Sequence, residues 1–332
     1  MAEQTSFSRT IAADVAGTRL DIWLSGQPEV ANRSQARRMI DHGLVAVEGQ
    51  RADAQRMRPG LTLEAGLVVR FSLDPRERAD PLTPDLPVPE IKVLYDDPDL
   101  CAIDKPVGLS AHPPESRRAP PAHTVASWAK ARFGDLPTVP DANRPGIVHR
   151  LDRETSGVML IAKSQLAFDS LRAQFRDRLA EKEYRCIVYG EPRFESDWID
   201  RAIASDKKHP ERMTVVDEGG RESSTYYEVV ERFEGMAHVM CRPKTGRTHQ
   251  IRVHMTAVGH SLVGDRVYRS RRRQHDRVPA EAPDPGRHCL HARRLVVEHP
   301  ASQEPLVIES SLPQDIESLL AWLRENRSPP KK

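Results

Sequence analysis

The chain has 332 residues, which is enough for two domains with real cores. Lys and Arg number 50 against 48 Asp and Glu, so the net charge of +2 neither supports nor excludes a nucleic-acid partner. The 4 cysteines are far apart and form no CxxC pair, which argues against a zinc ribbon and against a disulfide framework. No apolar run reaches about 18 residues, and residues 1–25 are polar, so we expect a cytoplasmic protein with no membrane partner.

The first folded segment is predicted to begin at residue 19. Residues 19–24 and 34–42 have the apolar spacing of two short helices, and LVAVEGQ at 44–50 predicts a strand followed by a turn. In the second helix we expect Ala36, Met39 and Ile40 to form an apolar, inward face. We expect Asn32 or Ser34 as its N-cap and Gly43 as the residue that ends it. The opposite face carries a candidate phosphate-binding cluster of Arg33, Arg37 and Arg38. A purely solubilising role is the alternative for each of these arginines.

Residues 72–90 contain prolines interleaved with acidic residues, so this stretch is predicted to be a semi-extended linker. It separates an expected first domain, residues 1–71, from a second, residues 91–326.

Patterns in the second domain predict strands at 91–95, 100–103, 158–162, 184–189, 224–230, 236–241 and 290–297. They predict helices at 125–133, 164–179, 248–258 and 313–323, with Leu179 and Val258 on apolar faces. Strands outnumber helices without alternating, so the class is α+β with a mixed, largely antiparallel sheet. Residues 269–288 are polar and basic and are predicted to be a mobile insertion.

The most charged loop of the chain lies at 144–162, RPGIVHRLDRETSGVMLIA. Residues 149–154 include the ionisable side chains His149, Arg150, Asp152, Arg153 and Glu154, and an apolar run follows them. A rigid catalytic loop and a salt-bridged surface turn both fit this pattern, and the loop alone does not separate them.

Three segments occur in a defined order: HRLDRETSG at 149–157, KEY at 182–184 and GRTHQIRVH at 246–254, with GHSLVGDRVY after the last. Together they resemble the motifs of the RluA-type pseudouridine synthases, which isomerise uridine in RNA. The start of the chain resembles the S4 RNA-binding domain, with Glu48 where that domain's strand motif has Asn. The two resemblances cover residues 19–326 and imply an S4-like domain followed by a pseudouridine synthase catalytic domain.

The resemblance also implies roles for individual residues. It makes Asp152 the catalytic residue, Tyr184 the ring that packs on the base, and Arg252 the partner of the aspartate. It makes Arg150 the side chain that inserts into the RNA at the place that the flipped-out uridine has left. Arg247 lies in a turn at the start of a predicted helix, where free backbone N–H groups favour a phosphate contact.

Within the family, RPGIVHRLD, HPERMTV and LVGDRVY are most similar to the D-type synthases of large-subunit ribosomal RNA, although C-type synthases share HRLDR and TSG. We therefore expect large-subunit (23S-type) ribosomal RNA or an assembling subunit as partner of a monomer. Alternatives are a synthase of other RNA such as tRNA, a non-catalytic ribosome-assembly factor, and a metal-dependent RNA hydrolase. No GxGxxG or GxxxxGK motif occurs, His249 and His254 have the wrong spacing for a zinc pair, and the cluster His288, Cys289 and His291 lacks a second ligand pair. Neither a cofactor nor a metal is expected.

Overall fold

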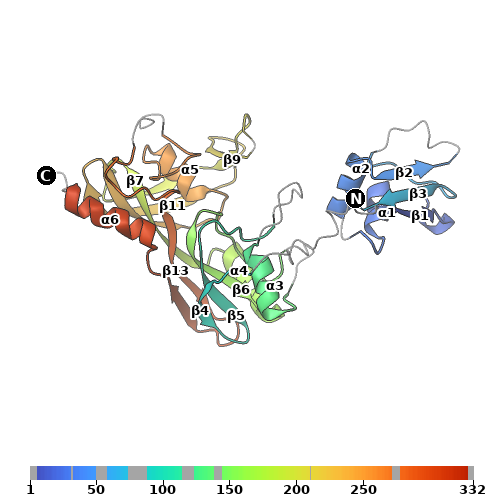
Figure 1. The fold of residues 1–332 in the computed structure, drawn as a ribbon, viewed down its shortest axis with the longest axis horizontal. Helices are drawn as coiled ribbons and strands as arrows, with labels where there is room; N and C mark the ends of the chain where they lie inside the picture. The colour runs from blue at the N-terminus through green and yellow to red at the C-terminus, as the bar shows by residue number, and fades with distance from the viewer. Residues whose placement is uncertain are drawn as a thin grey trace. The chain divides into compact units, whose positions relative to one another are not determined.

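The computed structural model describes residues 6–30, 33–49, 58–73, 88–113, 123–137, 144–209, 211–270 and 277–327, without the side chains of Ser34 and Arg38. The chain divides into two compact units, residues 1–80 and 81–332 (Figure 1). Most of the predicted linker at 72–90 lies outside the described residues. None of the helices in the described ranges is long and apolar enough to cross a membrane.

The first unit packs two helices, α1 (Leu20–Ser25) and α2 (Arg33–Asp41), on a three-stranded antiparallel sheet of order β1-β3-β2. The strands are β1 (Ser6–Thr10), β2 (Val45–Glu48) and β3 (Val68–Ser72), and a short 3-10 turn η1 (Ala13–Val15) follows β1. The prediction that the first folded segment begins at residue 19 is wrong, because β1 pairs with β3. The predicted inward face of α2 is confirmed, because Ala36, Met39 and Ile40 are all buried. Ser34 lies inside the helix rather than at its cap, and Asn32 lies outside the described residues.

The second unit is built on a nine-stranded sheet of order β4-β5-β6-β13-β7-β12-β11-β8, with β14 also paired to β13. Its strands are β4 (Lys92–Asp96), β5 (Leu100–Lys105), β6 (Ser156–Ala162), β7 (Glu181–Tyr189), β8 (Ser196–Asp200), β11 (Ser224–Phe233), β12 (Met236–Pro243), β13 (Leu290–Glu298) and β14 (Pro305–Glu309). A separate hairpin pairs β9 (Ile203–Ser205) with β10 (Met213–Val215). Only the β6–β13 pair is parallel among the strand pairs of the described residues, so the predicted mixed, largely antiparallel sheet is confirmed.

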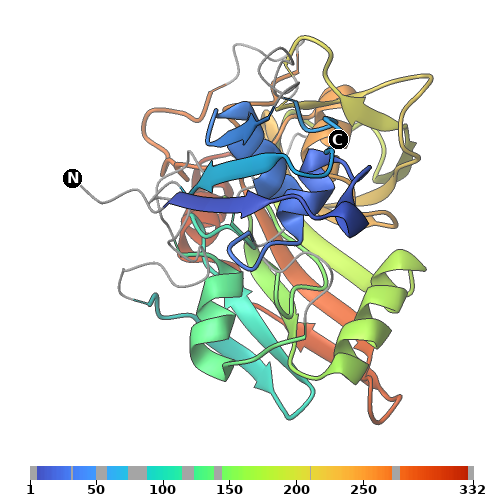
Figure 2. The ribbon, with the colours of Figure 1, turned by 90° about the vertical axis from the view of Figure 1, so that its right-hand side faces the viewer.

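Helices cover both faces of this sheet. α3 (Val125–Phe133) packs on odd-numbered residues of β5 and β6, and α4 (Gln165–Arg176) packs on even-numbered residues of the same strands. Because alternate residues of a strand point to opposite faces, the two helices lie on opposite sides, as Figure 2 shows. On β7 the same alternation places α5 (Gln250–Ala257) over even-numbered residues and α6 (Gln314–Asn326) over odd-numbered ones.

The parallel pair brings the predicted catalytic loop against β13. Gly157 pairs with Ala292 at φ 113°, and a Cβ there would lie 2.2 Å from the Ala292 carbonyl oxygen. Only glycine permits this close approach. The TSG end of the loop is therefore held directly against the neighbouring strand.

Three predictions for the second unit are wrong. Leu179 is 68% exposed because α4 ends at Arg176, and Arg178 then turns the chain with a φ of 65°. Val258 is exposed because it follows the end of α5. The predicted mobile insertion is wrong for residues 277–288, where Arg287 and His288 are buried and form hydrogen bonds with the charged loop. Residues 271–276 lie outside the described residues.

Candidate active site

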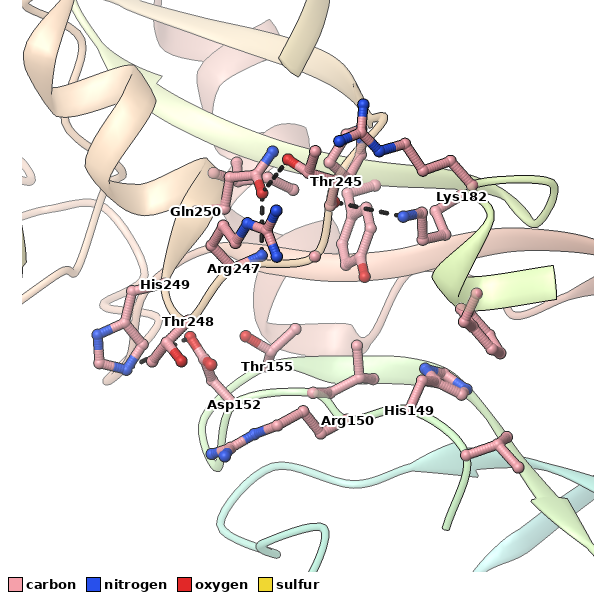
Figure 3. Close-up of a pocket in the computed structure, with 18 of the residues that line it drawn as sticks. His149, Arg150, Asp152, Thr155, Lys182, Thr245, Arg247, Thr248, His249 and Gln250 are labelled. Atoms are coloured by element: carbon pink, nitrogen blue, oxygen red, sulfur yellow. Dashed lines mark hydrogen bonds and ion pairs between the residues drawn. The ribbon is translucent and has the colours of Figure 1, made fainter. Parts of the chain in front are cut away.

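A cleft of about 750 Å³ opens in the second unit. Its walls come from the charged loop, α4, the start of β7 and the turn that leads into α5 (Figure 3). Five of the predicted site residues line it: Arg150, Asp152, Tyr184, Arg247 and Arg252. Three segments that are distant in sequence therefore meet in one cavity.

The Asp152 carboxylate lies in this cleft with 18% of its side chain exposed. Its Oδ2 accepts a hydrogen bond from Arg252 Nη1 at 3.2 Å, and His249 Nε2 lies 3.9 Å from the same oxygen. Within the described residues, Oδ1 accepts no hydrogen bond. One carboxylate oxygen is thus oriented by a cation, and the other has no donor among the described residues.

Arg252 is itself buried. Its Nε and Nη2 donate to Asp265 at 2.7 and 3.0 Å, and its guanidinium lies 4.8 Å from the ring centroid of Tyr268. Asp265 also accepts hydrogen bonds from the backbone N–H groups of Val267 and Tyr268. Burial alone would raise the pKa of Asp265, but Arg252 and these N–H groups hold it below its usual range. The arginine therefore approaches Asp152 in a fixed orientation.

His249 is the second basic side chain near Asp152, and it lies at the N-terminus of α5. Its backbone is left-handed, with a φ of 57°, which is uncommon outside glycine and is found at functional sites. The ring Nδ1 lies 2.7 Å from the hydroxyl of Tyr268, and burial lowers the pKa of the imidazole. The motif GRTHQ draws attention to this histidine, but its backbone conformation is not visible in the sequence.

Tyr184 presents a partly buried ring from β7 to the cleft. Burial and the charge of Asp152 raise the pKa of its phenol, so the hydroxyl stays protonated at neutral pH. Within the described residues no group hydrogen-bonds to this hydroxyl. Tyr184 thus offers a flat apolar surface with a free polar tip beside the carboxylate.

Buried polar side chains outside the set of predicted site residues hold the loop from behind. Lys105 is fully buried, and its ammonium donates to the carbonyls of Pro106, Leu109 and Arg153 at 2.8, 2.9 and 3.2 Å. Burial lowers the pKa of Lys105 to about 7. The carbonyl of Arg153 lies one residue beyond Asp152, so this lysine fixes the backbone that carries the carboxylate.

A second brace comes from the segment before β13. Arg287 donates to the carbonyl of Glu154 at 3.0 Å and to Ser156 Oγ at 3.1 Å, while Asp315 holds its other side. His288 Nε2 lies 2.9 Å from Thr155 Oγ1. Burial lowers the pKa of His288 to about 4, so the ring is neutral at pH 7. These contacts explain why residues 287–288 are ordered despite their polarity.

The cleft is strongly basic. Its lining includes two acidic residues, Asp152 and Asp169, against a larger set of basic ones. The basic lining residues are Arg150, Arg172, Arg176, Arg178, Lys182, Arg221, Arg247 and Arg252. A cavity with this charge balance attracts polyanions such as an RNA backbone. Across the described ranges, no cluster of three or more His, Cys, Asp or Glu side chains is arranged to hold a metal ion.

The remaining predicted site residues belong to the first unit. Arg33 and Arg37 each lie 3.0 Å from the fully buried carboxylate of Asp21, which Arg19 also contacts at 3.0 Å. Burial alone would raise the pKa of Asp21, but these three arginines hold it well below its usual range. The side chain of Arg38 lies outside the described residues. The arginines remain about half exposed, so one buried carboxylate holds three cations at the surface.

Comparisons with known proteins define the class of this fold and site. The family model for RNA pseudouridylate synthase matches residues 99–257, and the S4 domain model matches residues 18–61. An RNA pseudouridine synthase of Synechocystis sp. is 33% identical over 317 residues, covering 95% of this chain and 92% of that protein. The structure of human RNA pseudouridylate synthase domain containing 4 superposes with a TM-score of 0.55 and 25% identity, covering 72% of this chain and 95% of that one.

The chain belongs to the RluA-type family of RNA pseudouridine synthases and carries an S4 domain at its start. Among its relatives is the ribosomal large subunit pseudouridine synthase D of Pseudomonas aeruginosa. That protein is 32% identical over 335 residues, covering 98% of each chain. The predicted family, fold class and enzyme class are thereby confirmed.

Proposed function

We propose that this enzyme converts specific uridines to pseudouridine in large-subunit ribosomal RNA. The observation that carries the proposal is the pair of Asp152 and Arg252 beside Tyr184 in a strongly basic cleft. Similarity to relatives named ribosomal large subunit pseudouridine synthase D supports ribosomal RNA as the substrate.

The reaction breaks the bond from C1′ of the ribose to N1 of the base and forms a bond from C1′ to C5. The proton on C5 is lost and N1 gains one, so no redox partner and no water are consumed. We assign the ionised carboxylate to Asp152, either as a nucleophile or as the group that takes a ribose proton. Arg252 orients that carboxylate through its hydrogen bond, and Tyr184 supports the detached base while it turns.

The uridine must leave its stack before Asp152 reaches C1′, which costs a few kcal/mol. We assign Arg150, an exposed residue two positions before the aspartate, to the space that the base vacates. Arg247 donates its backbone N–H to the side chain of Gln250 and its Nε to the carbonyl of Glu222, which leaves part of the guanidinium for a phosphate. Arg33, Arg37 and Arg38 supply further phosphate contacts from the first unit.

The proposed organisation is an S4-like RNA-binding domain at residues 1–71, a linker at 72–90 and a catalytic domain at 91–326. The division of the chain near residue 80 is compatible with these bounds. We further propose that the enzyme acts in the cytoplasm. We also propose that it is a monomer, because one cleft contains every group that we assign to the reaction.

Carbodiimide-probed primer extension on ribosomal RNA tests the function and locates the modified uridines. Cells that lack the protein should lose one or more reverse-transcriptase stops in large-subunit RNA, and the wild-type gene should restore them. Restoration by Asp152→Asn would point instead to a non-catalytic assembly role. If the stops in large-subunit RNA are unchanged and stops in tRNA are lost, the substrate is tRNA instead.

A further inference from the structure

The cleft extends beyond the space around Asp152. Figure 3 shows Asp152, Thr248 and His249 at one end of the cavity and His149 and Lys182 at the other. The volume of about 750 Å³ lies in the upper part of the range for small-molecule pockets, which is ample for more than a single nucleoside. The far end therefore needs an occupant of its own.

That end contains a second aromatic surface. The ring of His149 stacks on Phe175 of α4, with centroids 4.4 Å apart and planes at 21°, and both side chains line the cleft. His149 Nε2 accepts the backbone N–H of Leu160 at 2.9 Å, which fixes the ring. Burial lowers the pKa of His149 to about 3, so the stack is uncharged at neutral pH. A neutral, anchored aromatic pair at the edge of a cavity is suited to stacking with a base.

Cations without carboxylate partners flank this stack. Arg172, one turn before Phe175 on α4, forms no ion pair within the described residues, and its guanidinium lies 5.4 Å from the ring centroid of Phe168. Within the part of the chain that the structure describes, Lys182 donates only to the carbonyl of Thr245, at 3.3 Å. Arg176, by contrast, is already paired with Asp177. Arg172 and Lys182 are thus the groups available for a phosphate next to the stack.

We propose that this end of the cleft is a second nucleotide subsite, which binds the nucleotide adjacent to the flipped uridine. Its base stacks on the pair of His149 and Phe175, and its phosphate contacts Arg172 and Lys182. The inference rests on the proposed function, because only a continuous RNA strand places a neighbouring base there. The subsite gives the enzyme a preference for single-stranded or bulged RNA around its target, since the neighbour must also leave its helical stack.

The base contact is tested by RNA binding and by turnover with a synthetic RNA that contains a uridine mapped by primer extension. Phe175→Leu keeps an apolar side chain but removes the ring, and should weaken binding about tenfold. Phe194→Leu is the matched control, because Phe194 is an exposed phenylalanine outside the cleft, and it should bind as wild type. An RNA that lacks the base on one side of the target uridine should bind wild-type enzyme about as weakly as Phe175→Leu binds the intact RNA. The Phe175→Leu variant should bind this abasic RNA no more weakly than it binds the intact RNA.

The phosphate contact is tested by a second variant with its own matched control. Arg172 and Arg193 each lie 5.4 Å from a phenylalanine ring centroid, but only Arg172 lines the cleft. Arg172→Gln should lower the slope of log affinity against log salt by about one, and Arg193→Gln should leave the slope unchanged. Melting temperatures check that every variant is folded.

The inference is overturned if Phe175→Leu binds RNA as tightly as wild type. It is also overturned if the losses of binding free energy caused by Phe175→Leu and by the abasic RNA are additive. RNA binding measured by fluorescence anisotropy requires no turnover, so these results test the subsite independently of the proposed function. An enzyme that binds as expected but forms no pseudouridine refutes the proposed function. An enzyme that forms pseudouridine with no effect of Phe175→Leu refutes the subsite alone.

Discussion

Arg252 and Asp265 form a bidentate ion pair, with Nε–Oδ2 at 2.7 Å and Nη2–Oδ1 at 3.0 Å, in a part of the site closed to solvent. The pair uses one edge of the guanidinium, formed by Nε and Nη2, and leaves Nη1 for Asp152. A planar arginine fork held at one side cannot rotate, so its remaining N–H group points in one direction. Asp265 thus positions the arginine that orients the Asp152 carboxylate.

Asp265→Asn should lower the rate of pseudouridine formation by about 10- to 100-fold, because a hydrogen bond to a charged group is lost and the fork loosens. RNA affinity should remain unchanged, since Asp265 is buried below the cleft. Single-turnover rates and anisotropy binding separate the two effects. Asp217→Asn, which alters a carboxylate that is 95% exposed, is the control. A rate equal to wild type in Asp265→Asn would show that Arg252 needs no such support.

Lys105→Met should lower the free energy of unfolding of the catalytic unit by about 2 to 4 kcal/mol. The substitution leaves the carbonyls of Pro106, Leu109 and Arg153 without the ammonium donor. Chemical denaturation measures the loss. Lys92→Met, which changes an exposed lysine of β4, should be neutral. Equal unfolding free energies for the two variants would contradict the bracing role.

The buried histidines behind the loop should make stability depend on pH. Burial lowers the pKa values of His288 and His291 to about 4, while each titrates near 6.5 in the unfolded chain. Between these values the unfolded chain binds more protons, so stability is complete above about pH 6.5 and falls as pH drops toward 4.

His288→Gln retains a partner for Thr155 but cannot titrate. It should therefore lose less stability than wild type between pH 6.5 and 4.5, by about 2 kcal/mol. Denaturation curves at several pH values measure this difference. Parallel pH profiles for the two proteins would show that His288 is not held neutral by the fold.

The arginines around Asp21 should contribute to RNA binding through charge alone. Replacing Arg33 and Arg37 together with Gln should weaken binding without altering the turnover of bound RNA. It should also lower the slope of log affinity against log salt by about two. Arg9→Gln, which breaks an exposed pair with Glu29 on the same unit, should leave the slope unchanged. If both variants behave alike, the arginine cluster serves only stability or solubility.

Apolar periodicity predicted the helices well, as Ile316, Leu319, Leu320 and Leu323 of α6 illustrate by all being buried. It failed at Leu179, because the pattern continues past the residue where the backbone turns.

The site was predicted only where a motif is contiguous. Asp265 and His288 were missed because their partners lie 13 and 133 residues away, at Arg252 and Thr155. Residue types alone do not reveal such pairings. The closeness of GHSLVGDRVY to the arginine motif was the one available signal for Asp265.

The most direct test of the account is pseudouridine formation by purified Asp152→Asn on a synthetic RNA that contains the mapped uridine. The substitution keeps the shape of the side chain and removes the charge on which both proposed roles depend. We predict no detectable pseudouridine, with RNA affinity and melting temperature close to wild type. Turnover near the wild-type rate would contradict the assignment of the chemistry to this carboxylate.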